Sequence, residues 1–332
     1  MTHLDHETPA GVSRVEEVRT AQQSAPRGSS GSISWRDVVA AYVGLTKPRV
    51  IELLLLTTVP VMFFADGGIP PVALVLATVV GGTLSAGSAS ALNCVYDRDI
   101  DEQMRRTRRR ALPRHVVSAR AAVIFGITLG ALATVVLLVW VNPLSALLAL
   151  TAEAFYLIVY TMWLKRRTTQ NIVWGGLAGC FPALIGWTAV TDELAWAPVV
   201  LFLVVFFWTP PHTWALALRY REDYAQVDVP MLPAVAPAAE VGRKIVAYSW
   251  ATVLMSLAFW PIAGTALTYP IAAVLLGGGF LIEAHRMSAR AQRTDDLSVI
   301  APMRLFHFSN LYLAMLFVAV ALDPLTTSLF PR

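Results

Sequence analysis

The chain has 332 residues, of which 56% are hydrophobic and only 14% are charged, with a formal net charge of +4. Its mean hydropathy is +0.58. This balance excludes an ordinary soluble domain and is typical of a protein that crosses the membrane several times. The only two cysteines, Cys94 and Cys180, lie far apart in apolar segments, which excludes a disulfide framework.

The chain divides into a polar tail, a long apolar domain and a short end. Residues 1–40 are rich in Ser, Gly, Thr, Glu and Arg and have no apolar periodicity, so we expect a disordered tail without a secretory signal. Residues 41–325 form the expected membrane domain, and 326–332 an external tail. A bilayer core of ~30 Å needs ~20 apolar residues per helix. Nine segments satisfy this and predict an all-α polytopic fold: 48–66, 71–96, 119–141, 143–164, 171–190, 196–218, 244–266, 269–287 and 305–323.

The basic residues predict the orientation of these nine helices. All of the 26 Lys and Arg residues except Arg332 fall in the N-terminal tail, at the entry of the first segment, or in and at the edges of the loops after the second, fourth, sixth and eighth segments. Because cytoplasmic loops carry the excess of Lys and Arg, the N-terminus is expected in the cytoplasm and the C-terminus outside. The loops after the second and sixth segments are long, which is typical of functional loops.

Three polar residues stand four positions apart at the end of the second segment. Steps of four place Asn93, Asp97 and Asp101 on one face of a helix. Carboxylate and amide oxygens are suitable ligands for Mg²⁺, especially beside phosphate. The alternative is a solvated helix end whose acids offset the arginines that follow. Asp99 faces nearly the opposite side and is a weaker candidate.

A second acidic cluster opens the loop after the sixth segment. Asp97 and Asp223 occupy equivalent places, four segments apart, which suggests two four-helix repeats plus a ninth helix. Parallel repeats would direct both acidic ends into one cavity. Coincidence is the alternative, because charges gather at cytoplasmic ends anyway. Asp228 lies five residues from Asp223 and so is not on the same helix face, and Glu222 has no acidic partner at helical spacing.

Several basic residues near these acids could bind a diphosphate through charge-assisted hydrogen bonds. The alternative is that they only set topology and contact lipid headgroups. The candidates are Lys47, Arg49, Arg105, Lys165 and Arg167.

Three further ionisable residues lie inside apolar segments, where a polar group is a functional candidate. Glu52 could instead pair with a basic residue near the interface, and Glu153 has no evident partner. His212 follows two prolines in the sixth segment and could line a cavity or bind haem iron, although a hydrogen-bonded packing role is the stronger expectation. The basic residues follow the topology, so nucleic-acid binding is not indicated.

Ordered motifs over residues 42–323 resemble those of the protoheme IX farnesyltransferases, or haem O synthases, within the UbiA-type membrane prenyltransferases. The first two, Leu45-Thr-Lys-Pro-Arg-Val and Asn93 through Arg108, surround the first acidic stripe. The others lie later in the chain and include Trp163-Leu-Lys-Arg-Arg-Thr-Thr-Gln-Asn-Ile, Ile185-Gly-Trp, Trp208-Thr-Pro-Pro-His-Thr-Trp and Asp223-Tyr224 with Val229-Pro-Met-Leu-Pro.

The resemblance implies a function, a fold and a site. Members transfer the farnesyl group of farnesyl diphosphate to the 2-vinyl group of haem b, with water addition, giving haem O and diphosphate. Their fold is nine helices around a central cavity in the cell membrane, with the site toward the cytoplasm. By motif, Asn93, Asp97, Asp101 and Asp223 would hold Mg²⁺ and diphosphate, and Tyr224 and His212 would contact substrate. Haem A synthase or terminal oxidase assembly are the implied partners.

The sequence departs from that family pattern at several positions. Ala111 stands where the family usually has Arg-Pro-Leu after the run of arginines. His115 and Asp228 stand where the family commonly has Gly. The second motif lacks the pair of acids, four apart, that other prenyltransferases have, so Asp223 alone is predicted as a metal ligand on that side.

Three other functions remain open at this level. A prenyltransferase acting on a quinone-precursor ring would use the same donor chemistry. A secondary transporter would need its acids near the bilayer midplane, whereas these lie at one face. A non-catalytic scaffold for oxidase assembly would leave the acidic stripe unexplained.

Overall fold

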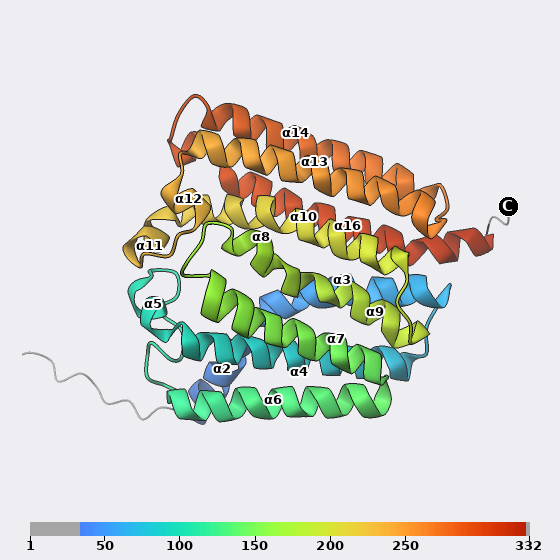
Figure 1. Ribbon diagram of the computed structural model, residues 1–332, viewed down its shortest axis with the longest axis horizontal. Coiled ribbons are helices and arrows are strands. Elements are labelled where there is room, and N and C mark those ends of the chain that lie inside the picture. The colour runs from blue at the N-terminus through green and yellow to red at the C-terminus, as the bar shows by residue number, and fades with distance from the viewer. Residues whose placement is uncertain (1–33, 330–332) are drawn as a thin grey trace, which may run out of the picture.

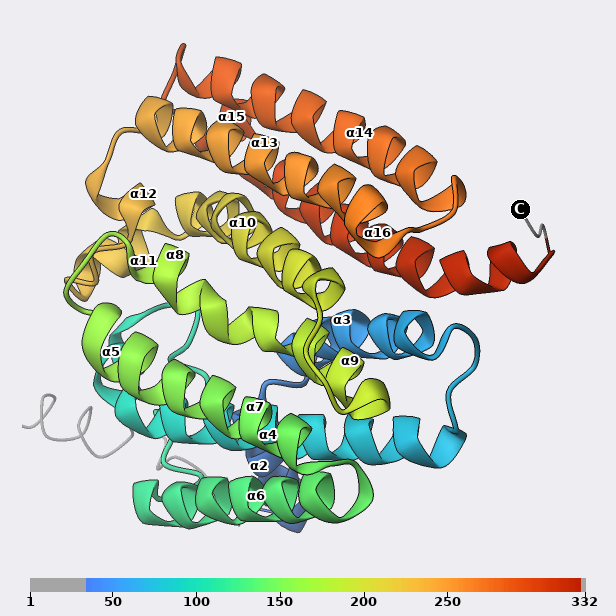
Figure 2. The same cartoon turned by 45° about the vertical axis from the view of Figure 1, so that its right-hand side comes forward.

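The computed structural model describes residues 34–329 and is all-helical over that range (Figure 1). The helices of the bundle lie side by side, and the short helices α5, α11 and α12 lie together at one end in both views (Figures 1 and 2). The bundle helices are α3 (Pro48–Asp66), α4 (Val72–Tyr96), α6 (Ala119–Trp140), α7 (Pro143–Ala154), α9 (Phe181–Thr191), α10 (Trp196–Arg219), α13 (Ala238–Ala263), α14 (Thr268–Ala291) and α16 (Pro302–Leu329). The remaining helices are α2 (Trp35–Thr46), α5 (Arg98–Gln103), α8 (Asn171–Gly175), α11 (Arg221–Gln226), α12 (Leu232–Val235) and α15 (Leu297–Ile300).

The structure confirms the predicted all-α polytopic class. It identifies eight candidate membrane spans within the described residues, where the sequence predicts nine. Within residues 34–329, eight helical segments are long and apolar enough to cross a membrane. The expected eighth span exists as the 24-residue helix α14 but is not one of these eight. Its second half carries Glu283, Arg286 and Arg290, which lower its apolar character. The nine-span count and the orientation of the termini therefore stay predictions.

Helices extend into both expected tails, whose boundaries stay predictions. Residues 35–40 of the expected N-terminal tail form the first half of α2. Ser34 begins this helix with a capping box, in which its side chain and that of Asp37 satisfy free backbone N–H groups. Residues 1–33 lie outside the described residues. At the other end α16 continues to Leu329, beyond the expected start of the external tail at 326.

Two expected spans are not regular α-helices throughout. The fourth begins as expected at Asn142-Pro143, where the Asn142 side chain accepts from the Ser145 N–H. It then becomes a π-helix over Phe155–Leu164, the wider turn that often marks functional sites. The fifth consists of α8, a 3₁₀ segment (Gly176–Cys180) and α9. The π-helix changes which residues face the bundle after residue 155.

Small residues let the central helices approach closely. α3 packs against α9 and α16, and α10 packs against α13 and α16. At Gly186 of α9, an added Cβ would lie 2.4 Å from the backbone oxygen of Thr58 in α3. Large apolar side chains such as Val139 and Leu275 remain exposed on the outer helices, as expected for surfaces that face lipid tails.

Two of the departures from the family pattern have left-handed backbones. His115 has φ 56° and Asp228 has φ 51°, the region where glycine has no steric penalty. Both stand where glycine is common in the resembling family. His and Asp tolerate this conformation better than most residues, so the loops keep a shape that glycine would adopt without strain.

The contact at Gly186 gives a matched pair of substitutions. Gly186→Ala should destabilise the fold by about 1–3 kcal/mol, because the neighbouring atom is backbone and cannot rotate away. Gly82→Ala, in α4 with no atom within 4 Å of the added Cβ, should be neutral or stabilise by up to about 1 kcal/mol. Thermal unfolding in detergent, followed by tryptophan fluorescence, measures both. Equal midpoints for the two variants would contradict the packing described here.

Candidate active site

The predicted acidic residues are buried at the end of the bundle where α5, α11 and α12 lie. Asn93 and Asp97 lie at the end of α4, Asp101 in α5 and Asp223 in α11, and each is at most 3% exposed. Both α4 and α10 are followed by a six-residue helix that carries acids, so the two acidic segments occupy corresponding places in the chain. Figure 1 shows α5 and α11 as neighbours at this end.

Asn93 and Asp97 are held by lysines from two other parts of the chain. The Lys47 ammonium donates to Asn93 Oδ1 at 2.6 Å, and Asn93 Nδ2 donates to Asp97 Oδ2 at 2.7 Å. Lys165 Nζ reaches the same Asp97 oxygen at 2.5 Å. Two members of the predicted stripe, Asn93 and Asp97, thus belong to a polar network that joins the start of α3, the end of α4 and the end of the π-helix.

Lys47 lies between α2 and α3 with a left-handed backbone, φ 54°. This conformation turns the chain sharply at the mouth of α3. Burial opposes the charge on Lys47, while the neighbouring Tyr156, Cys94 and Asp101 favour it, and the pKa of Lys47 is raised. The ammonium group is positioned to bind an anion beside Asn93.

The π-helix supplies the third side of the network. Asn93 Nδ2 also donates to Thr161 Oγ1 at 3.1 Å, and Thr161 in turn donates to the carbonyl five residues earlier, at Tyr156. The Lys165 N–H bonds to Tyr160 O with the same five-residue spacing. This wider turn sets the direction in which Thr161 and Lys165 face α4.

One oxygen of the site has no hydrogen-bond partner. Asp97 Oδ1 is fully buried and unpaired in hydrogen bonds, with only the Arg166 guanidinium nearby at 3.7 Å. Arg166 instead forms two 2.7 Å bonds to Asp99, and these bonds hold the pKa of the Asp99 carboxyl below its usual range. An unpaired carboxylate oxygen in a buried site is costly unless a cation or donor completes it.

The second acidic segment is bound to the first loop. Arg105 Nε donates to Asp223 Oδ1 at 3.1 Å, and the Arg106 N–H donates to Asp223 Oδ2 at 3.1 Å. The Arg105 guanidinium also pairs with Glu222 at 2.7 Å, an exposed contact that adds little stability. These bonds join the loop after α4 to the loop after α10, so the two halves close on each other here.

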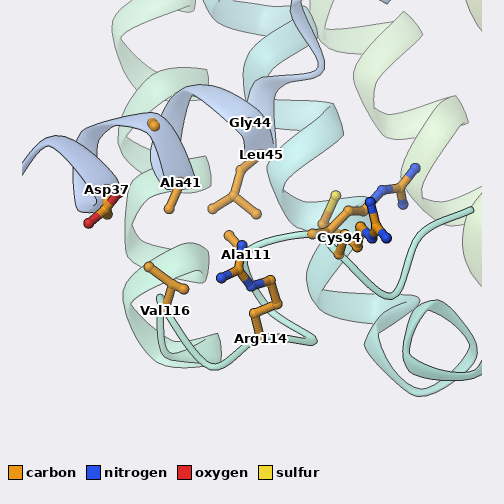
Figure 3. A pocket seen from close by; sticks show the side chains of 11 residues that line it. Asp37, Ala41, Gly44, Leu45, Cys94, Ala111, Arg114 and Val116 are labelled. Atoms are coloured by element: carbon orange, nitrogen blue, oxygen red, sulfur yellow. The ribbon is translucent and has the colours of Figure 1, made fainter. Parts of the chain in front are cut away.

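Arg110 connects the acidic network to a neighbouring cavity. Its guanidinium pairs with Asp101 at 2.6 Å. Arg110 also lines a cavity of about 580 Å³ between α2 and the loop that precedes α6 (Figure 3). Arg109 and Arg114 make the loop side of this cavity basic, whereas Leu45 and neighbouring alanines make the α2 side apolar.

The donor set fits a hard divalent cation, although the acids do not yet converge on one point. Within the described part of the chain, no three His, Cys, Asp or Glu side chains are grouped closely enough for a common ion. Asp97 Oδ1 is nevertheless free, and carboxylate and amide oxygens beside phosphate oxygens suit Mg²⁺. The assignment of Asn93, Asp97, Asp101 and Asp223 as ligands stays a prediction.

The other residues predicted to bind substrate differ in their burial and in their contacts. Arg49 and Arg167 are exposed and make no ion pair within residues 34–329. Arg166, next in sequence to Arg167, and Arg110 occupy the site instead, and the sequence offered no way to choose among adjacent arginines. Tyr224 is buried in α11.

The remaining candidates lie away from the acidic network. His212 contacts α16 from within α10. Glu52 is exposed and does not pair with Lys47 or Arg49. Glu153 accepts hydrogen bonds from Ser85 and Ser88 of α4. The exposed Asp228 is at the end of the loop after α11.

Comparisons with known proteins agree with this architecture. The profile of the UbiA prenyltransferase family matches residues 54–322. A protoheme IX farnesyltransferase of a Nocardioides species is 74% identical over 93% of this chain and 98% of its own length. One from Cutibacterium acnes is 55% identical over 94% and 91%, and one from Streptomyces coelicolor is 53% identical over 92% and 99%.

Solved structures show the same fold at low sequence identity. A digeranylgeranylglyceryl phosphate synthase structure has a TM-score of 0.71 at 14% identity, covering 87% of this chain and 99% of that one. A UbiA homologue from Archaeoglobus fulgidus, bound to DMAPP and Mg²⁺, has a TM-score of 0.63 at 17% identity, covering 84% and 98%. The buried acidic and basic network, the helical bundle and the family match together place this chain in the UbiA prenyltransferase family.

Proposed function

We propose that this chain transfers the farnesyl group of farnesyl diphosphate to the 2-vinyl group of haem b, with addition of water, to give haem O and diphosphate. The observation that best supports this proposal is the buried network at Asn93 and Asp97. Two lysines and an arginine surround these two residues, and Asp97 Oδ1 accepts no hydrogen bond within residues 34–329. The relatives that share 53–74% identity over most of their length are named protoheme IX farnesyltransferases. Their names favour haem b over a quinone-precursor ring as the acceptor.

The basic residues of the network perform the electrostatic part of the reaction. As the allylic C–O bond breaks, negative charge builds on the leaving diphosphate. Lys47 and Lys165 lie within hydrogen-bond distance of Asn93 and Asp97, so both ammonium groups can rotate to the diphosphate oxygens without leaving the site. Fixed positive charges in a site that excludes water stabilise that developing charge.

Asn93, Asp97, Asp101 and Asp223 are the residues that would hold Mg²⁺ in this site. The ion would supply further positive charge against the diphosphate. Asp97 Oδ1 is available without breaking a hydrogen bond, because its ion-pair partner, the Arg166 guanidinium, lies at 3.7 Å. Asp101 and Asp223 would each have to release an arginine, Arg110 or Arg105, and both arginines would then be free to bind the diphosphate.

The carbon chemistry takes place on the apolar side of this network. The farnesyl C1 bonds to the terminal carbon of the vinyl group, the adjacent carbon takes a water oxygen, and one proton is released. The long apolar helices supply walls that can shield the C15 chain and the intermediate cation from water. Within residues 34–329, the loops at the active end carry most of the Lys and Arg residues, so we place this end at the cytoplasmic face of the cell membrane.

The assay that tests this function uses the full chain in liposomes with haem b, farnesyl diphosphate and Mg²⁺, and detects haem O by chromatography and mass spectrometry. Asp97→Asn should lower turnover by about a hundredfold or more, because it removes one charge from the centre of the network. Asp192→Asn is the matched control, since Asp192 is an exposed residue at the end of α9. Absence of haem O from the wild-type reaction would overturn the proposal. Undiminished turnover of Asp97→Asn would overturn the site.

Removal of the cation gives a separate test. Chelation of divalent ions should reduce haem O formation by about a hundredfold or more, and added Mg²⁺ should restore it, because several kcal/mol of charge stabilisation is lost with the ion. The measurement is the initial rate before and after re-addition. A rate that does not respond to chelation would show that the basic residues alone stabilise the diphosphate.

A further inference from the structure

The imidazole of His212 makes a hydrogen bond through one ring nitrogen and, within the described residues, none through the other. His212 lies in α10, and its Nδ1 is 2.9 Å from Ser309 Oγ of α16. Its Nε2 makes no hydrogen bond to any residue within 34–329. It is also not among the fully enclosed, unpartnered polar atoms of that range, so Nε2 keeps some accessible surface on a half-buried residue. A purely packed histidine would have both nitrogens bonded or enclosed.

The partner of Nδ1 decides which nitrogen carries the proton. The Ser309 hydroxyl has a single proton, which it donates to the Phe306 carbonyl at 2.7 Å. With that proton directed at Phe306 O, Ser309 Oγ accepts from Nδ1–H of His212, the tautomer that this geometry favours. In a neutral imidazole with a proton on Nδ1, the lone pair is on Nε2. The Ser309 carbonyl accepts from Trp208 Nε1 at 2.8 Å, which fixes the same turn of α16 from a second direction.

Two aromatic rings hold the imidazole in one plane. Trp208 stacks on it with ring centroids 4.2 Å apart and an angle of 20° between planes. Phe306 stacks on it with a centroid distance of 4.5 Å and an angle of 28°. Since both faces contact aromatic rings, only an edge of the imidazole is free. The edge opposite Ser309 carries the Nε2 lone pair.

This arrangement is that of a metal ligand. Histidines that bind metals through one nitrogen donate the other N–H to a fixed acceptor, which sets the tautomer and the ring orientation. No carboxylate in the described range pairs with His212, so nothing there favours the charged imidazolium. The proposed acceptor substrate carries one metal with axial positions open to a ligand, the iron of haem b.

We propose that Nε2 of His212 binds the iron of haem b and thereby positions its vinyl group for farnesyl transfer. The inference rests on the proposed function. His212 precedes the end of α10 at Arg219 by seven residues, or about 10 Å along the helix. An iron bound there lies on the apolar side of the acidic network. The rim of the porphyrin, where the vinyl groups stand, can then extend toward the farnesyl diphosphate.

The test compares two porphyrins on the same protein. Haem b and metal-free protoporphyrin IX are titrated into the full chain in nanodiscs, for the wild type and for His212→Ala. The affinity for haem b should fall at least about tenfold in the variant, with loss of the histidine-ligated absorption and EPR spectrum. The affinity for protoporphyrin IX should not change, because it has no iron. Added imidazole should restore the ligated spectrum in His212→Gly.

Two controls separate ligation from folding. His285→Ala removes an exposed histidine whose Nε2 already accepts from Trp250, and it should leave haem binding unchanged. Farnesyl diphosphate binding to His212→Ala should equal that of the wild type, which would show that the acidic end is intact. Ser309→Ala keeps the ligand but frees its tautomer, so it should weaken haem binding less than His212→Ala does.

The outcomes distinguish this inference from the function beneath it. A wild type that forms haem O while His212→Ala keeps the wild-type iron spectrum would overturn the ligand assignment alone. Equal losses of haem b and protoporphyrin IX affinity would also overturn it, because they would indicate a packing defect. A wild type that neither binds haem b nor forms haem O would overturn the proposed function.

Discussion

The constraint on which the structure depends is the charge on carboxylates that are buried at one end of an apolar bundle. Asp97, Asp101 and Asp223 are all nearly inaccessible. A buried carboxylate is very unfavourable unless a cation and hydrogen bonds compensate it. Each of the three has a basic partner, and for Asp97 and Asp223 it comes from a distant segment: Lys165, Arg110 and Arg105 pair with Asp97, Asp101 and Asp223. The same pairs therefore join the helices and hold the charged groups that the reaction needs.

These ion pairs explain ligand binding better than they explain the stability of the fold. Buried ion pairs often contribute little net stability, because desolvation offsets their attraction, while removing one partner is strongly destabilising. The arrangement here leaves Asp97 Oδ1 without a hydrogen bond and places five basic groups around three acids. A ligand that brings both a divalent cation and phosphate oxygens would satisfy both sets of charges at once.

Much of this could be predicted from the sequence, because it follows from local periodicity and charge. The four-residue spacing placed Asn93 and Asp97 on one face, and they do lie in one network. The Asn142-Pro143 signal marked a true helix start. The membership of the prenyltransferase family, suggested by the motifs, is confirmed by the family match.

What could not be predicted depends on contacts between distant segments. The π-helix after Ala154 has no signal in apolar periodicity, yet it determines where Lys165 and its neighbours face. Apolar periodicity does not distinguish Arg166 from Arg167, whereas in the structure it is Arg166 that approaches Asp97. The tautomer of His212 likewise depends on Ser309, which is 97 residues away.

The most direct measurement is an experimental structure of the full chain in a lipid environment with Mg²⁺ and a non-reactive farnesyl diphosphate analogue. We expect the diphosphate to bind between Lys47, Lys165 and Arg105. The metal should bind Asp97 Oδ1, and the farnesyl chain should lie among the apolar helices. A diphosphate bound instead in the cavity lined by Arg109 and Arg114, with the pairs of Asp97 and Asp223 unchanged, would contradict it.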